Sequence, residues 1–185
     1  MDHMDLDSGL IESPALALAV HCLGARHRAD PVTVLLAAVA LELAAYTGED
    51  EAALRVPAGG FRLDCTPSRY RHEPFGSLLR RAEVAYEDSR PDGCWFADRR
   101  HDSTGAAGVH GAARLAAVVP RDPAPAGARF FLCLLRLGRT AELRLCAAHG
   151  YLGRRGPLGF LSDLERVLVR ATGTSTTAGL YAAVR

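Results

Sequence analysis

Apolar positions recur at helical spacing in the first third of the chain and predict two consecutive helices. Ser13 followed by Pro14 is typical of an N-cap with proline in the first turn, and predicts a helix over residues 13–27. Asp30 and Pro31 give a second start, and Gly48 stands where a left-handed residue ends a helix. This second helix carries one apolar stripe: Val32, Leu35, Leu36, Val39, Leu43 and Tyr46.

Two later stretches have the same periodicity. Residues 75–88 alternate an apolar stripe with an arginine- and glutamate-rich face, which predicts an amphipathic helix with its polar face in water. Pro157 lies near the start of a final helix that Gly173 ends. The stripe of this last helix contains Leu158, Leu161, Leu164, Leu168 and Ala171.

Alternation and apolar runs predict the strands. Residues 53–57 and 61–65 form a predicted hairpin with Gly59 and Gly60 as the turn. The nearly continuous apolar run 129–137 predicts a central strand, joined through residues 138–140 to an alternating strand that ends at His149.

The remaining segments carry weaker patterns. Residues 90–111 read as irregular, and residues 112–119 as a short strand or helix. We expect residues 1–12 to form an arm with little core contribution, residues 13–172 a single domain, and residues 173–185 a tail. The fold class predicted is α/β, with helices packed on a mixed sheet.

Composition narrows the functional classes. The 185 residues carry a net charge of only +1, which argues against nucleic acid or an anionic membrane as partner. Five cysteines without a C-x-x-C spacing favour a reducing cytoplasm over a disulfide framework or a zinc site, so no metal is expected. The longest apolar run, residues 32–45, is too short to span a bilayer and contains Glu42, so we expect a soluble protein.

Several local strings resemble the second lobe of condensation domains from nonribosomal peptide synthetases. Residues 30–50, which end in Tyr-Thr-Gly-Glu-Asp, are similar to the helix and "YTGxxD" turn that open that lobe. Residues 73–82 (EPFGSLLRRA) resemble its "PSFRELLxRV" helix, and residues 141–168 its late strand and helix. The resemblance spans roughly residues 10–172. It implies a single C-terminal lobe of the chloramphenicol-acetyltransferase-like fold, in which two related lobes meet at a tunnel.

The chemistry of that family is missing from this stretch. The catalytic His-His-x-x-x-Asp-Gly motif belongs to the first lobe, where its second histidine orients or deprotonates the attacking amine. Only His3 and Asp7 have the required spacing here, with Asp2 in place of the first histidine. Residues 58–68 also shorten the family's insertion that floors the tunnel, which leaves an acceptor site remodelled or absent.

Three further side chains are candidates for catalysis. His101 precedes Asp102 and Ser103, Cys94 has histidines within reach in sequence, and His149 ends a predicted strand, where pockets often lie. Each also has a simpler interpretation as a solvated loop or hairpin residue. The arginine pairs Arg99-Arg100 and Arg154-Arg155 are candidates for binding an acidic carrier protein, whose phosphopantetheine arm is the only ligand expected in place of a cofactor.

Three functions remain open on this basis. The first is a degenerate condensation-domain lobe that acts by association with a partner lobe, with itself as a homodimer, or with carrier proteins and synthetase modules in peptide natural-product biosynthesis. The second is an acyltransferase of condensation type with a reworked or partner-completed site that acts on carrier-bound thioesters. The third is an unrelated α/β domain with a small-molecule ligand.

Overall fold

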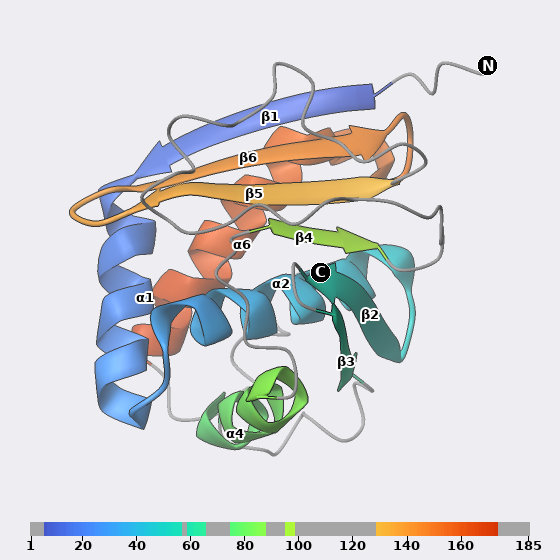
Figure 1. Cartoon of the computed structure of the whole chain (residues 1–185). Coiled ribbons are helices and arrows are strands. Elements are labelled where there is room, and N and C mark those ends of the chain that lie inside the picture. Colours follow the sequence, from blue (N-terminus) through green and yellow to red (C-terminus); the bar gives the residue numbers. More distant parts are fainter. Residues whose placement is uncertain (1–5, 57–58, 66–74, 88–94, 99–128, 174–185) are drawn as a thin grey trace.

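The structure is a computed structural model that describes residues 6–56, 59–65, 75–87, 95–98 and 129–173. Strand β1 and helices α1 and α2 open the fold, followed by β2, β3 and α4; β4, β5, β6, the short 3₁₀ helix η1 and α6 close it (Figure 1). The bounds are β1 Leu6–Ser13, α1 Pro14–His27, α2 Pro31–Thr47, β2 Glu51–Val56, β3 Gly59–Asp64, α4 Phe75–Glu87, β4 Trp95–Asp98, β5 Phe130–Leu137, β6 Ala141–Ala148, η1 Gly153–Arg155 and α6 Gly156–Gly173.

The first two helices begin and end where the capping residues predict. The hydroxyl of Ser13 accepts a hydrogen bond from the amide of Leu16 at 3.0 Å, and a carboxylate oxygen of Asp30 accepts one from the amide of Val32 at 2.8 Å. Gly48 has a φ of +72°, in the left-handed region, and its amide bonds the carbonyl of Ala44. Local chemistry therefore sets both ends of α2.

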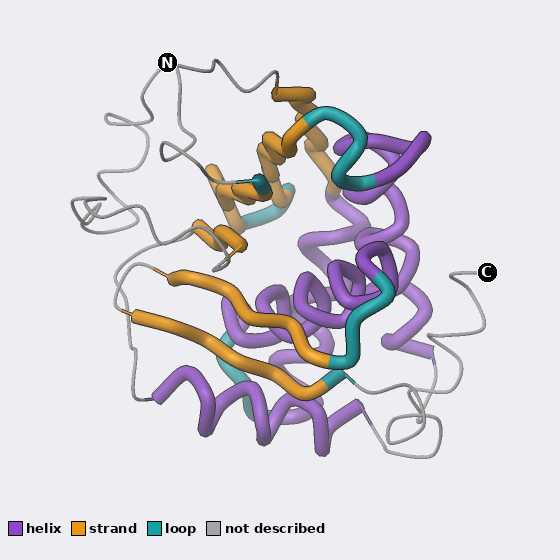
Figure 2. Tube along the Cα trace, turned by 90° about the vertical axis from the view of Figure 1, so that its right-hand side faces the viewer, coloured by secondary structure: helices purple, strands orange, loops and turns teal. Residues whose placement is uncertain are grey.

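Helix α2 is buried on every side through most of its length, so the single apolar stripe predicted for it is wrong. All residues from Thr33 to Ala44 are buried, and α2 contacts α1, α4, α6 and β2. Small alanines between the larger side chains let neighbours approach it closely from all directions. Figure 2 shows most of the helices grouped to the right of the strands.

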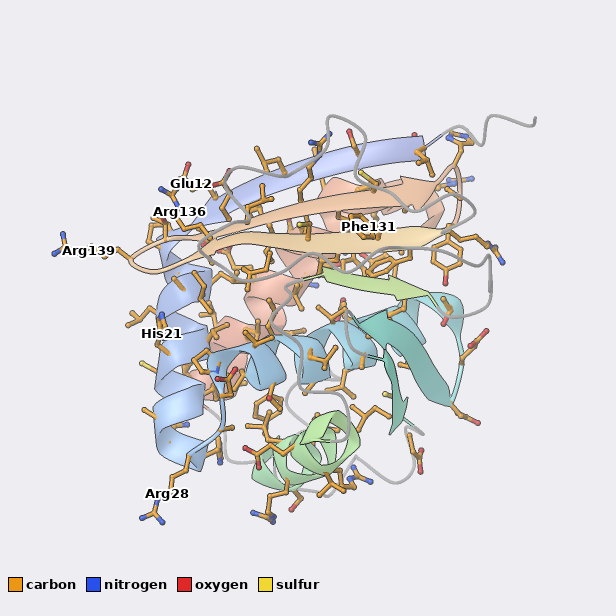
Figure 3. The ribbon with its side chains drawn as sticks, in the orientation of Figure 1. Glu12, His21, Arg28, Phe131, Arg136 and Arg139 are labelled. Atoms are coloured by element: carbon orange, nitrogen blue, oxygen red, sulfur yellow. The ribbon has the colours of Figure 1, made fainter. Side chains whose placement is uncertain are left out.

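The described strands form one six-stranded sheet in the order β1-β6-β5-β4-β2-β3. Every pairing is antiparallel, so the sheet is not mixed as the sequence suggested. Two of the five pairings, β2–β3 and β5–β6, join strands that follow each other directly as hairpins, and hairpin strands are necessarily antiparallel. Strand β5 is interior, as predicted, and the β5–β6 hairpin turns through residues 138–140, where Arg139 projects outward (Figure 3).

The N-terminal arm prediction is wrong for residues 6–12, because β1 occupies them. All eight residues of β1 pair with β6, from Leu6 opposite Ala148 to Ser13 opposite Ala141. The sequence hides this strand because only its inward side meets the core, where Gly9 is buried against Leu158 of α6. The backbone ladder with β6 stabilises it in place of a strong apolar pattern.

Two other local predictions are corrected. Gly59 and Gly60 lie inside β3, opposite Val56 and Arg55, and so do not form the turn predicted for them. The stretch 90–111 was expected to be irregular, yet Trp95–Asp98 forms β4, which bridges β5 to β2. The element predicted at residues 112–119 and most of the predicted tail lie outside the described residues.

The core lies between the sheet and the helices α1, α2 and α6. The ring of Phe160 in α6 packs edge-on against both Phe130 of β5 and Tyr46 of α2, at centroid distances of 5.4 and 5.2 Å. Leu161, Leu164, Leu168 and Ala171 are buried as predicted, but Leu158 is 57% exposed because it lies over Gly9 at the edge of the sheet.

No single helix in the described ranges is long and apolar enough to cross a membrane. Helices α1 and α2 together reach that length and composition, but the chain bends by 108° between them.

Candidate functional site

Two polar groups stand out among the described residues, one at a corner of the sheet and one inside the core. The corner group joins His149, which follows β6, to Asp7 of β1. The Nδ1 atom of His149 lies 3.2 Å from Oδ2 and 3.4 Å from Oδ1 of Asp7. The antiparallel pairing of β1 with β6 brings these residues together across 142 positions of sequence.

The corner pair has one feature of a catalytic histidine and lacks others. A carboxylate on Nδ1 orients the imidazole and leaves Nε2 turned away from the pair, as in acid–base dyads. However, the side chain of His149 is 77% exposed and that of Asp7 44% exposed, so water surrounds the pair. Arg129, stacked 4.6 Å from the ring centroid of Tyr151, lies at the same end of the sheet. The geometry permits proton transfer but provides no enclosure.

The interior group centres on Asp163 of α6, whose side chain is only 3% exposed. One carboxylate oxygen accepts hydrogen bonds from the Tyr46 hydroxyl and from Nη1 of Arg155, both at 2.6 Å. The other accepts one from Nη2 of Arg166 at 2.6 Å. Asp163 thereby connects α2, η1 and α6 through charge-assisted hydrogen bonds, which satisfies its buried charge.

Glu42 of α2 lies beside this group and is less well satisfied. The residue is 2% exposed, and its Oε1 has no hydrogen-bond partner. Burial, with a smaller contribution from the negative charge of Asp163, raises the pKa of Glu42 to about 7. Burial and the hydrogen bond to Asp163 also raise the pKa of Tyr46. We refer to Glu42, Tyr46, Arg155, Asp163 and Arg166 as the α2–α6 cluster.

Sequence reasoning did not find the α2–α6 cluster. The available signal was Glu42 itself, a carboxylate in the middle of the longest apolar run. The charged residues around it, Arg155, Asp163 and Arg166, lie more than 110 positions away, and single-sequence periodicity contains no information on that proximity.

The structure places some of the predicted site residues and leaves others outside the described part of the chain. Asp7 and His149 are brought together, while His3, Cys94, His101, Arg99 and Arg100 lie outside the described residues. Arg155 already has an internal partner in Asp163, whereas its neighbour Arg154 is exposed in η1. Carrier binding remains an untested prediction for Arg154, as it does for Arg99 and Arg100. Within the described ranges, no group of three or more His, Cys, Asp or Glu side chains could hold a metal ion.

The architecture, an antiparallel sheet with packed helices, is similar in fold to a solved condensation domain. A solved structure described as the condensation domain from Monacolin K polyketide synthase MokA matches with a TM-score of 0.56 and 14% identity. The match covers 95% of this chain and 49% of that chain, so this chain spans about half of its length. No protein-family model and no curated protein matches the sequence. At this identity the likeness shows the fold alone.

Proposed function

We propose that this chain is a degenerate lobe of a condensation-type scaffold that acts by association, with a second lobe and with carrier proteins, in natural-product assembly. The observation that carries the proposal is the coverage: nearly all of this chain corresponds to about half of a condensation domain. A scaffold built from two lobes needs a counterpart for each, which is why association is the expected mode of action.

The assignment to the second lobe is supported by where the resembling strings fall. The Tyr-Thr-Gly-Glu-Asp string ends α2 and leads into β2, the residues 73–82 string enters α4, and the late string covers β6 and α6. The sequence has no His-His-x-x-x-Asp-Gly motif. Nonribosomal peptide or polyketide assembly is the class of pathway that fits these resemblances.

Binding to a carrier protein tests this proposal directly. The purified chain is titrated calorimetrically with a peptidyl carrier protein in its phosphopantetheinylated and unmodified forms, and its association state is measured by sedimentation. We expect self-association, or binding of the phosphopantetheinylated form that Arg154→Glu weakens roughly tenfold, about 1.4 kcal/mol. Arg139→Glu at the distant β5–β6 turn is the matched control (Figure 3). A monomer that binds neither carrier form contradicts the proposal.

A second candidate function, acyl transfer by this chain, is favoured by the contact between His149 and Asp7. The chain is incubated with an acyl thioester on a carrier protein and an amine acceptor, and the amide product is measured by mass spectrometry. If the dyad is catalytic, His149→Ala and Asp7→Asn reduce product at least about a hundredfold. His21→Ala changes an exposed histidine of α1 and leaves the rate unchanged (Figure 3).

Cys94 and His101 stand as the other candidates for the same activity. Cys94→Ala and His101→Ala belong in the same assay. Product formation that none of the four variants reduces removes the catalytic alternative as stated.

A further inference from the structure

The junction of α2 and α6 contains a carboxyl group in an unusual position. Glu42 lies in the centre of the most deeply buried helix, and its Oε1 is enclosed without a hydrogen-bond partner. Across the junction, Nε of Arg166 is likewise buried without a partner, although Nη2 of the same guanidinium binds Asp163. A donor and an acceptor are thus both left unused within one cluster of charged residues.

Within the described part of the chain, the charges that act on Glu42 come from one side only. They are Asp163 and Arg166 of α6 and Arg155 of η1, with Tyr46 of α2 bound to Asp163. Among the described residues of α1, α4 and β2, which also pack against α2, no charged group contributes to the shift at Glu42. The protonation state of Glu42 is therefore coupled to the position of α6.

The neutral and the ionised forms of Glu42 require different surroundings at the α2–α6 junction. A neutral carboxyl tolerates enclosure next to Asp163, whose charge is already balanced by two arginines. An ionised carboxylate adds a second negative charge and requires hydrogen bonds for both oxygens. While α6 is docked on α2, Oε1 of Glu42 has no hydrogen-bond partner. The ionised form of Glu42 is therefore stabilised only when α6 separates enough to admit water or to redirect Arg166.

We propose that Glu42 is a proton-dependent latch: it is neutral while α6 is docked on α2, and its ionisation loosens the α2–α6 junction. The elements that respond are α6, which covers β1 and β6, and η1, which Arg155 ties to Asp163. The inference is independent of any acyl-transfer or carrier-binding activity, because it rests only on the α2–α6 cluster.

Two measurements on the full chain test the latch. Carbon-13 NMR of glutamate-labelled protein follows each side-chain carboxyl between about pH 4 and pH 9. We expect one glutamate to titrate near neutrality and its signal to be missing in Glu42→Gln. Hydrogen exchange of α2 and α6 amides, corrected for the intrinsic pH dependence, should accelerate roughly tenfold between about pH 6 and pH 8 in the wild type. In Glu42→Gln the corrected rates should stay constant.

The outcomes separate clearly. If no wild-type glutamate titrates above about pH 6, the latch is overturned without any variant. Equal pH dependence of exchange in wild type and Glu42→Gln also overturns it. Glu42→Met, a second neutral side chain of similar length, guards against a fold defect of the glutamine variant and should match it. Glu165→Gln on α6 is the control that keeps the wild-type response.

Discussion

Asp163 connects more elements than any other single polar side chain described above. Its carboxylate binds a tyrosine from α2 and arginines from η1 and α6, and it is almost completely enclosed. The two guanidinium groups stay partly exposed, at 59% and 36%, so they can return to water if the carboxylate is lost. That partial exposure limits the energetic cost of removing Asp163.

Replacing Asp163 by asparagine should therefore destabilise the fold without abolishing it. The amide keeps one acceptor but loses the charge that binds both arginines, and we expect a loss of about 2–3 kcal/mol in the free energy of unfolding. Tyr46→Phe removes a single hydrogen bond and should cost about 1 kcal/mol. Urea unfolding followed by circular dichroism measures both. If the asparagine variant costs no more than the phenylalanine variant, the ion pairs contribute nothing to stability.

Glu42 makes stability depend on pH in a direction that follows from its pKa. The value is raised from 4.5 to about 7 on folding, so between these limits the folded state binds the proton more tightly than the unfolded state. The contribution of Glu42 is therefore fully present below about pH 4.5 and is lost as the pH rises through about 7, by roughly 3 kcal/mol at most. Urea unfolding of wild type minus Glu42→Gln across this range isolates it. A difference that stays constant or grows in favour of wild type with rising pH contradicts the assignment.

Sequence reasoning at this scale found Asp7 and His149 as separate candidates but not as a pair. Nothing local in either stretch indicates that β1 lies beside β6. The sequence predicts Arg155 as a partner-binding residue, with a solvated arginine pair as the simpler alternative, and neither interpretation includes an internal ion pair. The carboxylate that engages it lies eight positions away on another helical segment.

At the scale of the elements, the corner between α1 and α2 is the tightest connection. The amide of Ala29 binds the carbonyl of Gly24, and Arg28 adopts a left-handed φ of +57° to turn the chain. Figure 3 shows the Arg28 side chain at the end of α1, pointing away from the helices. A side chain at Gly24 would place its Cβ 2.9 Å from the Ala29 carbonyl oxygen. Only glycine lets the backbone close this corner.

Gly24→Ala should consequently destabilise the protein although alanine favours helices. Helix propensity contributes about 1 kcal/mol in its favour, but the clash is with backbone that cannot move without opening the corner. We expect a net loss of about 1–2 kcal/mol in thermal unfolding. Gly173→Ala, at the end of α6 with no atom within 4 Å of the added carbon, should be neutral or slightly stabilising. Stabilisation by both substitutions would show that the corner yields easily.

The elements that sequence predicts well are those whose signals are local. The cap residues Ser13 and Asp30 and the left-handed Gly48 define α1 and α2 without reference to the rest of the chain. Strands β1 and β4 were missed because their stability depends on neighbours distant in sequence. The burial of α2 on all sides likewise depends on the elements packed around it. The hydrophobic pattern of its own sequence predicts only one buried stripe.

At the scale of the whole molecule, the sheet places the first strand of the chain, β1, beside its last strand, β6, among the described residues. Strand β1 runs along β6, and α6 contacts both (Figure 1). The surface row formed by Glu12, Arg136 and Glu142 crosses β1, β5 and β6, with Arg136 in contact with Glu12 and 3.6 Å from Glu142. Figure 3 shows Glu12 and Arg136 side by side at the end of these strands. The N-terminal strand is thus integral to the sheet.

Deleting residues 1–12 should therefore do more than shorten the chain. It removes β1 while leaving the Ser13 cap, exposes the edge of β6 and uncovers part of α6, and we expect the melting temperature to fall by at least about 10 °C. Deleting residues 1–5, which precede β1, is the matched control and should change it little. Differential scanning calorimetry compares the two. Equal melting temperatures would mean that β1 is dispensable for stability.

The adjacency of β1 and β6 also dictates the order of events on the ribosome. The partner of β1 is synthesised some 130 residues later, so the earliest strand emerges long before its ladder can form. Until then its backbone groups depend on water, and an apolar strand in that position would attract other nascent chains. The β1 segment exposes little apolar surface before β6 is synthesised, because it contains Asp7, Ser8, Gly9 and Glu12. The same polar composition that makes β1 hard to predict from sequence therefore lowers its tendency to aggregate until the β5–β6 hairpin has been synthesised.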